Sequence, residues 1–240
     1  MGKATLDRLN ETGAMTEMKT IKAFAFDAYG TIFDVFSVTA LCEELFPGRG
    51  SDLARLWRAK QLQYTLLHSL MGRYRDFWDL TGDGLVFASK SLQLELTPHA
   101  RKRLMEAWFN LAVFPDVKPG LIALKKKGLL LSILSNGDSK MLEGAVENGG
   151  LSGLFDNIIS AGEAGIYKPS PRVYGLAPGR MKVKSAELGF VSSNSWDISG
   201  AASAGLAAFW IQRSQTEPAE ELGYEATRTV KSVGELELLV

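Results

Sequence analysis

The sequence has little of the residue types that disulfide frameworks and thiolate or imidazole metal sites require. Cys42 is the only cysteine, which excludes an intrachain disulfide and any cage of several thiolates, and favours a reducing compartment. The two histidines, His68 and His99, stand far apart in sequence, and two isolated histidines do not make a metal site. Cysteine and histidine therefore give no reason to expect a bound metal.

The chain also lacks an excess of charge of one sign and a long apolar run. Its 27 lysines and arginines balance its 27 aspartates and glutamates, so no basic field exists to capture nucleic acid or an anionic membrane. The most apolar segments, such as 128–134 and 204–211, are much shorter than the about 18 residues that span a bilayer. We therefore expect a soluble, cytoplasmic protein with no nucleic-acid or membrane partner.

Length and composition predict three regions along the 240 residues. Residues 1–19 mix charged and polar side chains without the apolar centre of a secretion signal, and are expected to form a flexible N-terminal extension. The remaining length is enough for one full domain with an inserted subdomain. We assign residues 20–35 and 113–240 to a core domain and residues 36–112 to the insertion.

Strand signals in the core region alternate with helical ones. A short apolar run over 21–26 predicts a buried first strand that ends at Asp27, and the alternation resumes after Pro119. Further strands are expected at 129–134, 156–160, 188–191 and 207–211. Such alternation is typical of an α/β fold with a doubly wound, mainly parallel, Rossmann-like sheet.

The inserted region shows helical spacing and no strand signal. Ser51 is the expected N-cap of a long helix that continues to Leu70. Thr97 and Pro98 predict the start of a later helix that runs through Leu111, because proline is favoured at the first helical position. The insertion is therefore predicted to be an all-helical cap subdomain.

Polar residues follow several of the predicted strands. In an open parallel sheet, ligands bind outside the carboxyl ends of the strands, and Asp27, Ser135, Asn136, Lys168 and the segment 192–197 occupy such positions. Each has an ordinary alternative as a turn cap, a loop residue or a solvated lysine. Their coincidence in one chain order favours a shared site.

Four of these segments closely resemble the motif series of L-2-haloacid dehalogenases, over about residues 21–215. They are Phe26-Asp27-Ala28-Tyr29-Gly30-Thr31-Ile32-Phe33-Asp34-Val35, Ser135-Asn136-Gly137, Tyr167-Lys168-Pro169, and Phe190-Val191-Ser192-Ser193-Asn194-Ser195-Trp196-Asp197. Segments 46–50, 56–58 and 60–65 look like the cap helices of that family. The parent haloacid dehalogenase superfamily consists mostly of phosphatases, so the choice between the two activities needs its own argument.

Metal-binding carboxylates of the superfamily's phosphatases are missing here. Those enzymes typically carry a second aspartate two residues after the nucleophile, where this chain has Tyr29. Ser192, Ser193 and Asn194 likewise stand where a further acidic residue would help to bind magnesium, an ion that prefers hard oxygen ligands. The sequence therefore predicts no metal and no other cofactor. A magnesium-dependent phosphomonoesterase and a non-catalytic carboxylate binder remain as alternatives.

The resemblance implies an enzyme, a hydrolase that converts small (S)-2-haloacids to (R)-2-hydroxyacids with inversion. Asp27 would attack C2 in an SN2 step and form an aspartyl ester, while Thr31 hydrogen-bonds its carboxylate. Lys168 would keep Asp27 ionised, because an ammonium nearby lowers a carboxylate pKa by roughly 1 to 3 units. The substrate would be a 2-haloalkanoic acid and one product a halide ion.

The remaining polar roles also follow the resemblance. Ser135 and Asn136 would bind the substrate carboxylate, and Arg58 in the cap would receive the halide. The last motif supplies Asp197 as base or positioner for the hydrolytic water, with Ser192 and Asn194 holding this cluster and the Lys168 amine. The division of water activation among Asp197, Asn194 and Lys168 stays open.

Apolar residues complete the predicted site. Tyr29, Leu62, Phe77 and Trp196 would form a wall around the substrate side group. Core packing is the ordinary alternative for each, and only Trp196, which lies inside a motif, is favoured over it. Tyr174 matches a further polar position of the family, which we count with the substrate-binding residues.

Two positions depart from the family pattern. Ala59 replaces a common glutamine beside Arg58, and Pro178-Gly179 is expected to break a helix. Relatives are often dimers, so a homodimer is possible.

Overall fold

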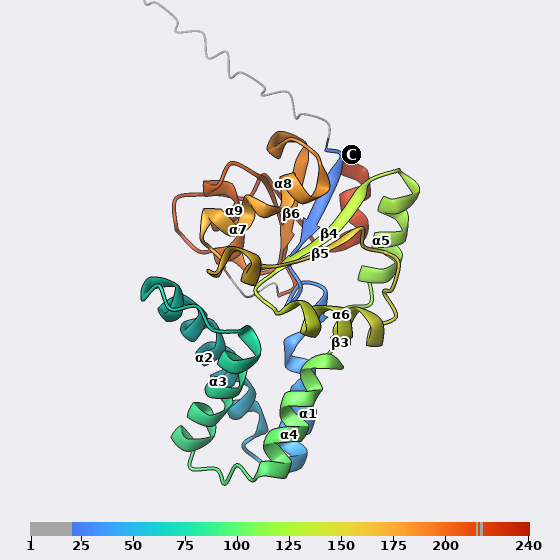
Figure 1. Cartoon of the computed structure of the whole chain (residues 1–240). Helices are drawn as coiled ribbons and strands as arrows, with labels where there is room; N and C mark the ends of the chain where they lie inside the picture. Colours follow the sequence, from blue (N-terminus) through green and yellow to red (C-terminus); the bar gives the residue numbers. More distant parts are fainter. Residues whose placement is uncertain (1–20, 215, 217) are drawn as a thin grey trace, which may run out of the picture.

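The computed structural model describes residues 21–214, 216 and 218–240, so the predicted extension over 1–19 lies outside the described residues. Figure 1 shows two parts, an α/β core at the top and a helical cap below it. Within the described ranges no helix has the length and apolar content that crossing a bilayer requires.

The core is built on a six-stranded parallel sheet in the order β5-β4-β1-β6-β7-β8. Its strands are β1 (Ala23–Phe26), β4 (Leu130–Ser135), β5 (Asn157–Ser160), β6 (Leu188–Ser192), β7 (Ala207–Ile211) and β8 (Arg228–Val230). Strand β1 is buried along its whole length because its four residues are apolar and it pairs with β4 on one side and β6 on the other. The predicted doubly wound parallel sheet is confirmed.

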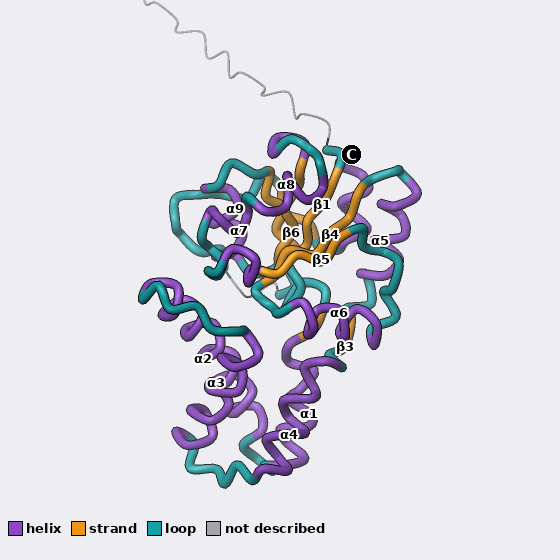
Figure 2. Tube along the Cα trace, in the orientation of Figure 1, coloured by secondary structure: helices purple, strands orange, loops and turns teal. Residues whose placement is uncertain are grey.

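Helices cover both faces of this sheet, as Figures 1 and 2 show. They are α5 (Val117–Lys126), α6 (Ser139–Asn148), α7 (Pro171–Tyr174), α8 (Leu176–Met181) and α9 (Ser195–Ser203), with 3-10 turns η3 (Ala161–Ala164), η4 (Ser185–Glu187) and η5 (Val233–Leu239). Helix α5 packs against η5, while α9 packs against β6 and β7. Because the strands are parallel, their carboxyl ends share one edge, which faces the cap.

The cap consists of helices between two short strands. Its elements are η1 (Val35–Val38), α1 (Thr39–Leu45), α2 (Gly50–Leu70), α3 (Phe77–Ser91), α4 (Pro98–Glu106) and η2 (Ala107–Phe109). Strands β2 (Phe33–Asp34) and β3 (Ala112–Val113) pair antiparallel where the chain enters and leaves. The predicted cap limits fall at this ribbon, and we propose it as the boundary between the two units.

Helices α2 and α3 form the main packed pair of the cap. They approach closely at Gly84, where an added Cβ would lie 3.2 Å from the backbone nitrogen of Gln61 and 3.4 Å from the carbonyl oxygen of Trp57. Any larger residue at position 84 would push the two helices apart. This contact brings buried polar side chains of α2 within reach of α3.

Two helix starts test the expected caps. Thr97 is the N-cap of α4 as predicted, with its hydroxyl accepting a hydrogen bond from Ala100 N at 3.1 Å. Ser51 is not the N-cap of α2, because the helix begins one residue earlier at Gly50. The amide of Gly50 instead donates to the Glu43 carboxylate at 2.8 Å, so a side chain from α1 satisfies this helix start.

Two expected helix limits also differ. Helix α4 ends at Glu106 and gives way to η2, so Leu111 lies outside the helix. The break after Tyr174 falls at Gly175, and Pro178 lies within α8 rather than ending it. Proline is tolerated there because it occupies the first turn of α8, where backbone N–H groups have no intrahelical partner.

Candidate active site

Asp27 lies immediately after β1, at the sheet edge that faces the cap, and it is almost fully buried. Three side chains donate hydrogen bonds to its carboxylate. Lys168 Nζ lies 3.0 Å from Oδ1, while Asn194 Nδ2 and Thr31 Oγ1 lie 2.9 and 3.1 Å from Oδ2. These donors fix the orientation of the carboxylate.

Lys168 connects two carboxylates inside the protein. Its Nζ lies 3.0 Å from Asp27 Oδ1 and 2.9 Å from Asp197 Oδ2, and its side chain has no exposed surface. Burial alone would lower the pKa of Lys168, but Asp197 and Asp27 together outweigh it and hold the pKa above its ordinary value. The amine therefore stays protonated and acts as a fixed positive charge.

Asp197 lies on α9, fully buried behind Lys168. Burial raises its pKa to about 6, with Asp27 adding to the rise and Lys168 opposing it. Tyr174 was expected among the substrate-binding residues, but its hydroxyl donates to Asp197 Oδ1 at 2.6 Å and it does not line the site cavity. Tyr174 is buried on α7, where its hydroxyl supports Asp197.

The segment after β6 holds the other carboxylate donor. Asn194 directs its amide to Asp27 and, at 3.3 Å, to the carbonyl oxygen of Tyr29, rather than to the Lys168 amine. The Ser192 hydroxyl accepts from Asn194 N at 3.1 Å, so Ser192 shapes this turn and acts on Asp27 only through Asn194. Thr31 is tied to the same segment, because Ser193 N donates to its hydroxyl at 2.8 Å.

A cavity of about 10 Å³ lies between the cap and the carboxylate of Asp27. Side chains from five segments that are distant in sequence line it, and every one of them was expected in the site. The lining residues are Asp27, Tyr29, Arg58, Leu62, Phe77, Ser135, Asn136, Asn194 and Trp196. The cavity holds about one water-sized sphere, so the cap and the core leave little space between them at the site.

Arg58 reaches this cavity from α2 and joins the cap to the core. Its Nη2 donates to the carbonyl oxygen of Tyr29 at 3.1 Å, and its Nη1 donates to Gln61 Oε1 at 2.6 Å. Burial lowers the pKa of Arg58 to about 10, although Asp27 opposes the change. The guanidinium therefore remains cationic at neutral pH and places a positive charge opposite the Asp27 carboxylate.

Ser135 and Asn136 end strand β4 at the floor of the cavity. Helix α6 begins only at Ser139, so these two residues precede the helix start instead of forming it. The Asn136 side chain accepts from Lys168 N at 2.9 Å, which ties this loop to the lysine segment. Ala59 is exposed and does not line the cavity.

The family model of haloacid dehalogenase-like hydrolases matches residues 21–205 of the chain. The chain belongs to this family. This haloacid dehalogenase-like hydrolase is 45% identical to an (S)-2-haloacid dehalogenase of Pseudomonas sp. (strain YL), over 82% of this chain and 85% of the relative. These matches assign the chain to the hydrolases.

Solved structures agree with this assignment. An L-2-haloacid dehalogenase structure superposes on this hydrolase with a TM-score of 0.89 and 44% identity, covering 92% of this chain and 99% of the other. The L-2-haloacid dehalogenase from Xanthobacter autotrophicus with chloropropionic acid covalently bound has a TM-score of 0.86 and 36% identity, covering 92% and 98%.

The donor set of the site does not fit a magnesium ion. Tyr29 occupies the position of the second acid, and its ring stacks on Phe77 at a centroid distance of 5.7 Å. The two carboxylates that remain, Asp27 and Asp197, both bind the Lys168 ammonium, which stands between them. Among the described residues no group of three or more acidic, histidine or cysteine side chains could hold a metal.

Several residues that the sequence reasoning missed support the site. Gln61 and Thr81 are fully buried polar side chains next to Arg58 and Phe77. Arg213 donates to the carbonyl oxygen of Thr31 at 2.8 Å and pairs with Asp116, so it anchors the loop that follows Asp27. A polar residue one helical turn from Arg58 was the signal that could have identified Gln61.

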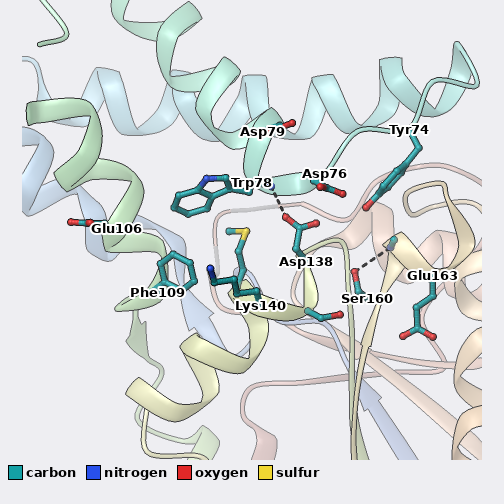
Figure 3. A pocket seen from close by; sticks show the side chains of 13 residues that line it. Tyr74, Asp76, Trp78, Asp79, Glu106, Phe109, Asp138, Lys140, Ser160 and Glu163 are labelled. Atoms are coloured by element: carbon teal, nitrogen blue, oxygen red, sulfur yellow. Dashed lines mark hydrogen bonds between the residues drawn. The ribbon is translucent and has the colours of Figure 1, made fainter. Parts of the chain in front are cut away.

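A further missed residue is Asp138, which lies in the groove shown in Figure 3. This groove of about 720 Å³ opens at the junction of cap and core, beside the site cavity rather than in it. From the core, the Asp138 carboxylate accepts hydrogen bonds from Phe77 N at 3.0 Å and Trp78 N at 2.7 Å, and it thereby caps α3. The same residue follows the Ser135–Gly137 loop directly.

Proposed function

We propose that the chain is an (S)-2-haloacid dehalogenase that hydrolyses small (S)-2-haloacids to (R)-2-hydroxyacids. One observation carries the proposal: the Asp27 carboxylate, held by Lys168, Asn194 and Thr31, lines the same small cavity as the Arg58 guanidinium. If C2 of a substrate lies between these two groups, Asp27 can attack it from one side while Arg58 stabilises the anion that leaves on the other side. The similar enzymes carry this activity in their names.

The first step is an SN2 displacement at C2 of the substrate. An oxygen of Asp27 forms a bond to C2, and the carbon–halogen bond breaks with its electron pair going to the halide. Attack from the side opposite the halogen inverts C2 and leaves an ester between Asp27 and the acid. Arg58 receives the halide, because a weakly hydrated guanidinium suits a large, soft anion. Ser135 and Asn136 bind the substrate carboxylate.

The second step is hydrolysis of this ester. A water adds to Cγ of Asp27, the bond from that carbon to the ester oxygen breaks, and the hydroxyacid leaves with the inverted configuration. One proton of the water goes to the departing hydroxyl oxygen, and the other is released to solvent as Asp27 returns to the carboxylate. Asp27 keeps one oxygen from the water. Because Asp197 is fully buried with Lys168 and Tyr174 on its oxygens, we assign it the positioning of Lys168. Asn194, which borders the cavity, is then the side chain that orients the water.

Metal independence is part of the proposal. Lys168 takes the place between the two carboxylates where a cation would neutralise them, and its charge is fixed by the fold. A metal chelator should therefore leave the rate unchanged. The wall of Tyr29, Leu62, Phe77 and Trp196 limits water and thereby strengthens the interaction of these charges with the substrate. A cytoplasmic location and a homodimer remain predictions from the sequence and the resemblance.

Halide release is the experiment that tests this function. We expect the protein to release chloride from L-2-chloropropionate in the presence of a chelator and to produce D-lactate. Asp27→Asn should abolish the release, whereas Asp34→Asn, an acid outside the cavity in the same segment, should retain it. Magnesium-dependent phosphate release without halide release would favour a phosphomonoesterase. Ligand binding without turnover would favour a carboxylate binder.

A further inference from the structure

A continuous line of hydrogen bonds joins Arg58 to the start of α3. Arg58 Nη1 donates to Gln61 Oε1 at 2.6 Å, and Gln61 Nε2 donates to Thr81 Oγ1 at 2.7 Å. Thr81 then donates to the carbonyl oxygen of Phe77 at 2.7 Å. Gln61 and Thr81 have no exposed surface, so water does not compete for these bonds.

The direction of the Gln61 amide is set by its partners. An arginine has no acceptor, so it requires the amide oxygen, while Thr81 uses its single proton on Phe77 and must accept from the amide nitrogen. Only one orientation of the Gln61 amide satisfies both neighbours. The close approach of α2 and α3 at Gly84 makes these short bonds possible.

The guanidinium of Arg58 consequently has two anchors on different parts of the protein. Gln61 holds Nη1 from the cap, and the carbonyl oxygen of Tyr29 holds Nη2 from the core. Two bonds to separate nitrogens of a planar group fix both its position and its plane. Without Gln61, only the bond to Tyr29 would hold this end of the long, flexible side chain.

We propose that Gln61 is a positioning residue that aims the Arg58 guanidinium at the departing halide. The proposal rests on the proposed dehalogenase function. Gln61 does not line the cavity and acts only through Arg58. The effect of replacing Gln61 should therefore be larger for a leaving group whose departure depends more on stabilisation by Arg58. Chloride is a poorer leaving group than bromide, so a misplaced guanidinium slows carbon–chlorine cleavage more than carbon–bromine cleavage.

The test compares L-2-chloropropionate with L-2-bromopropionate. Gln61→Met keeps the unbranched shape and removes both hydrogen bonds. Its kcat/KM for the chloro acid should fall about 10- to 100-fold, the size of effect that follows a misplacement of about 1 Å. The value for the bromo acid should fall several-fold less. Because kcat/KM reports steps up to halide departure, slow ester hydrolysis does not mask the difference.

Thr65→Val is the matched control. Thr65 is a buried polar residue one turn further along α2, and its hydroxyl bonds only to the carbonyl oxygen of Leu62. This variant should leave the bromo-to-chloro ratio unchanged. Thr81→Val removes the far end of the line and should raise the ratio in the same direction, so it also tests the idea if Gln61→Met folds poorly. Combined with Gln61→Met it should add little.

If the wild type is active and kcat/KM falls equally for both acids in Gln61→Met and Thr81→Val, the positioning role of Gln61 is overturned. The proposed dehalogenase function would stand in that case. A ratio that also rises in Thr65→Val would overturn the positioning role too, because the effect would then belong to cap stability. If the wild type releases neither halide, the proposed function itself fails.

Discussion

Four buried or half-buried charges define the site at the scale of single residues. Asp27 and Asp197 carry negative charge, and Lys168 and Arg58 carry positive charge, so the site is balanced before a ligand enters. A substrate carboxylate adds one more negative charge and keeps it, while the negative charge of Asp27 passes to the halide that leaves toward Arg58 when the ester forms. Lys168 compensates Asp27 and Asp197 at 3.0 and 2.9 Å, which lets a carboxylate remain an effective nucleophile without exposure to water.

Tyr29 contributes to the site through the packing of its ring rather than through hydrogen bonds of its hydroxyl. Within the described residues the buried hydroxyl has no hydrogen-bond partner, while the ring stacks on Phe77 and packs edge-on against Trp108 at 5.2 Å. An unpaired buried hydroxyl costs free energy. Tyr29→Phe should therefore keep full halide release and raise the thermal midpoint, measured by calorimetry. A large loss of kcat would show that the hydroxyl takes part in the reaction.

Asp197 should set the acid limit of activity. Burial raises its pKa to about 6, so Asp197 is protonated below that pH and no longer pairs with the Lys168 ammonium. We expect kcat/KM to fall as the pH drops through about 6. Asp197→Asn should lower the rate at neutral pH and remove this acid limb from a pH–rate profile. An unchanged acid limb in the variant would assign it to another group.

At the scale of elements, the start of α3 is the point where the cap meets the core. Phe77 is the first residue of this helix and also lines the cavity. Asp76, at the N-cap position, makes no side-chain cap, and Asp138 of the core supplies it instead. The Asp138 carboxylate interacts with the dipole of α3 and accepts two N–H bonds from its first turn. Phe77 of the apolar wall is thereby attached to the loop that carries Ser135 and Asn136.

Asp138→Ala should loosen this attachment. Removing a helix cap costs about 1 kcal/mol, and displacement of Phe77 should raise the KM for L-2-chloropropionate. Burial raises the pKa of Asp138, with Asp76 and Asp79 adding to the rise, so its charge is itself unfavourable in the folded protein. Asp138→Asn should therefore cost less stability than Asp138→Ala. Chemical denaturation measures both.

The neighbouring exposed acid provides the control for this cap. Asp76→Asn alters a carboxylate in the same groove without touching the two amides of α3, so its KM should match that of the wild type. Equal KM values for wild type and Asp138→Ala would contradict a link between Asp138 and the cavity wall.

At the scale of the whole molecule, the sequence predicts the core well because its signals are local. Apolar runs such as 21–26 locate buried strands, and parallel pairing brings their ends to one edge. Asp27, Ser135 and Asn194, at the ends of β1, β4 and β6, therefore line one cavity. Helix limits were less predictable, because side chains of other elements decide them, as Glu43 of α1 does at the start of α2.

Tertiary contacts explain what the sequence could not reveal about the site. Tyr174 is polar and close to Lys168 in sequence, yet the packing of α7 turns its hydroxyl to Asp197 and away from the cavity. The partners of Gln61 and Asp138, which are Thr81 on α3 and the amide of Trp78 in the cap, are contacts that no local pattern encodes. Ser192 belongs to a motif but reaches Asp27 only through Asn194.

The small volume of the site cavity predicts that the two units separate to admit a substrate. A space of about 10 Å³ cannot hold a 2-haloacid, and the amides of Phe77 and Trp78 bridge cap and core through Asp138. Saturating propionate, which carries a carboxylate but no halogen, should stabilise the closed form and slow hydrogen exchange at these two amides. Exchange along β4 should change much less. Equal protection with and without propionate would argue against opening at this junction.

The central claim is that Asp27 attacks carbon, and a single turnover in H₂¹⁸O tests it most directly. With enzyme in excess over L-2-chloropropionate, the first hydroxyacid formed takes its hydroxyl oxygen from Asp27, while the water oxygen enters the carboxylate. Mass spectrometry should find unlabelled D-lactate and one ¹⁸O in the peptide that contains Asp27. Labelled lactate with an unlabelled peptide would mean that water attacks the substrate directly, and would contradict the account.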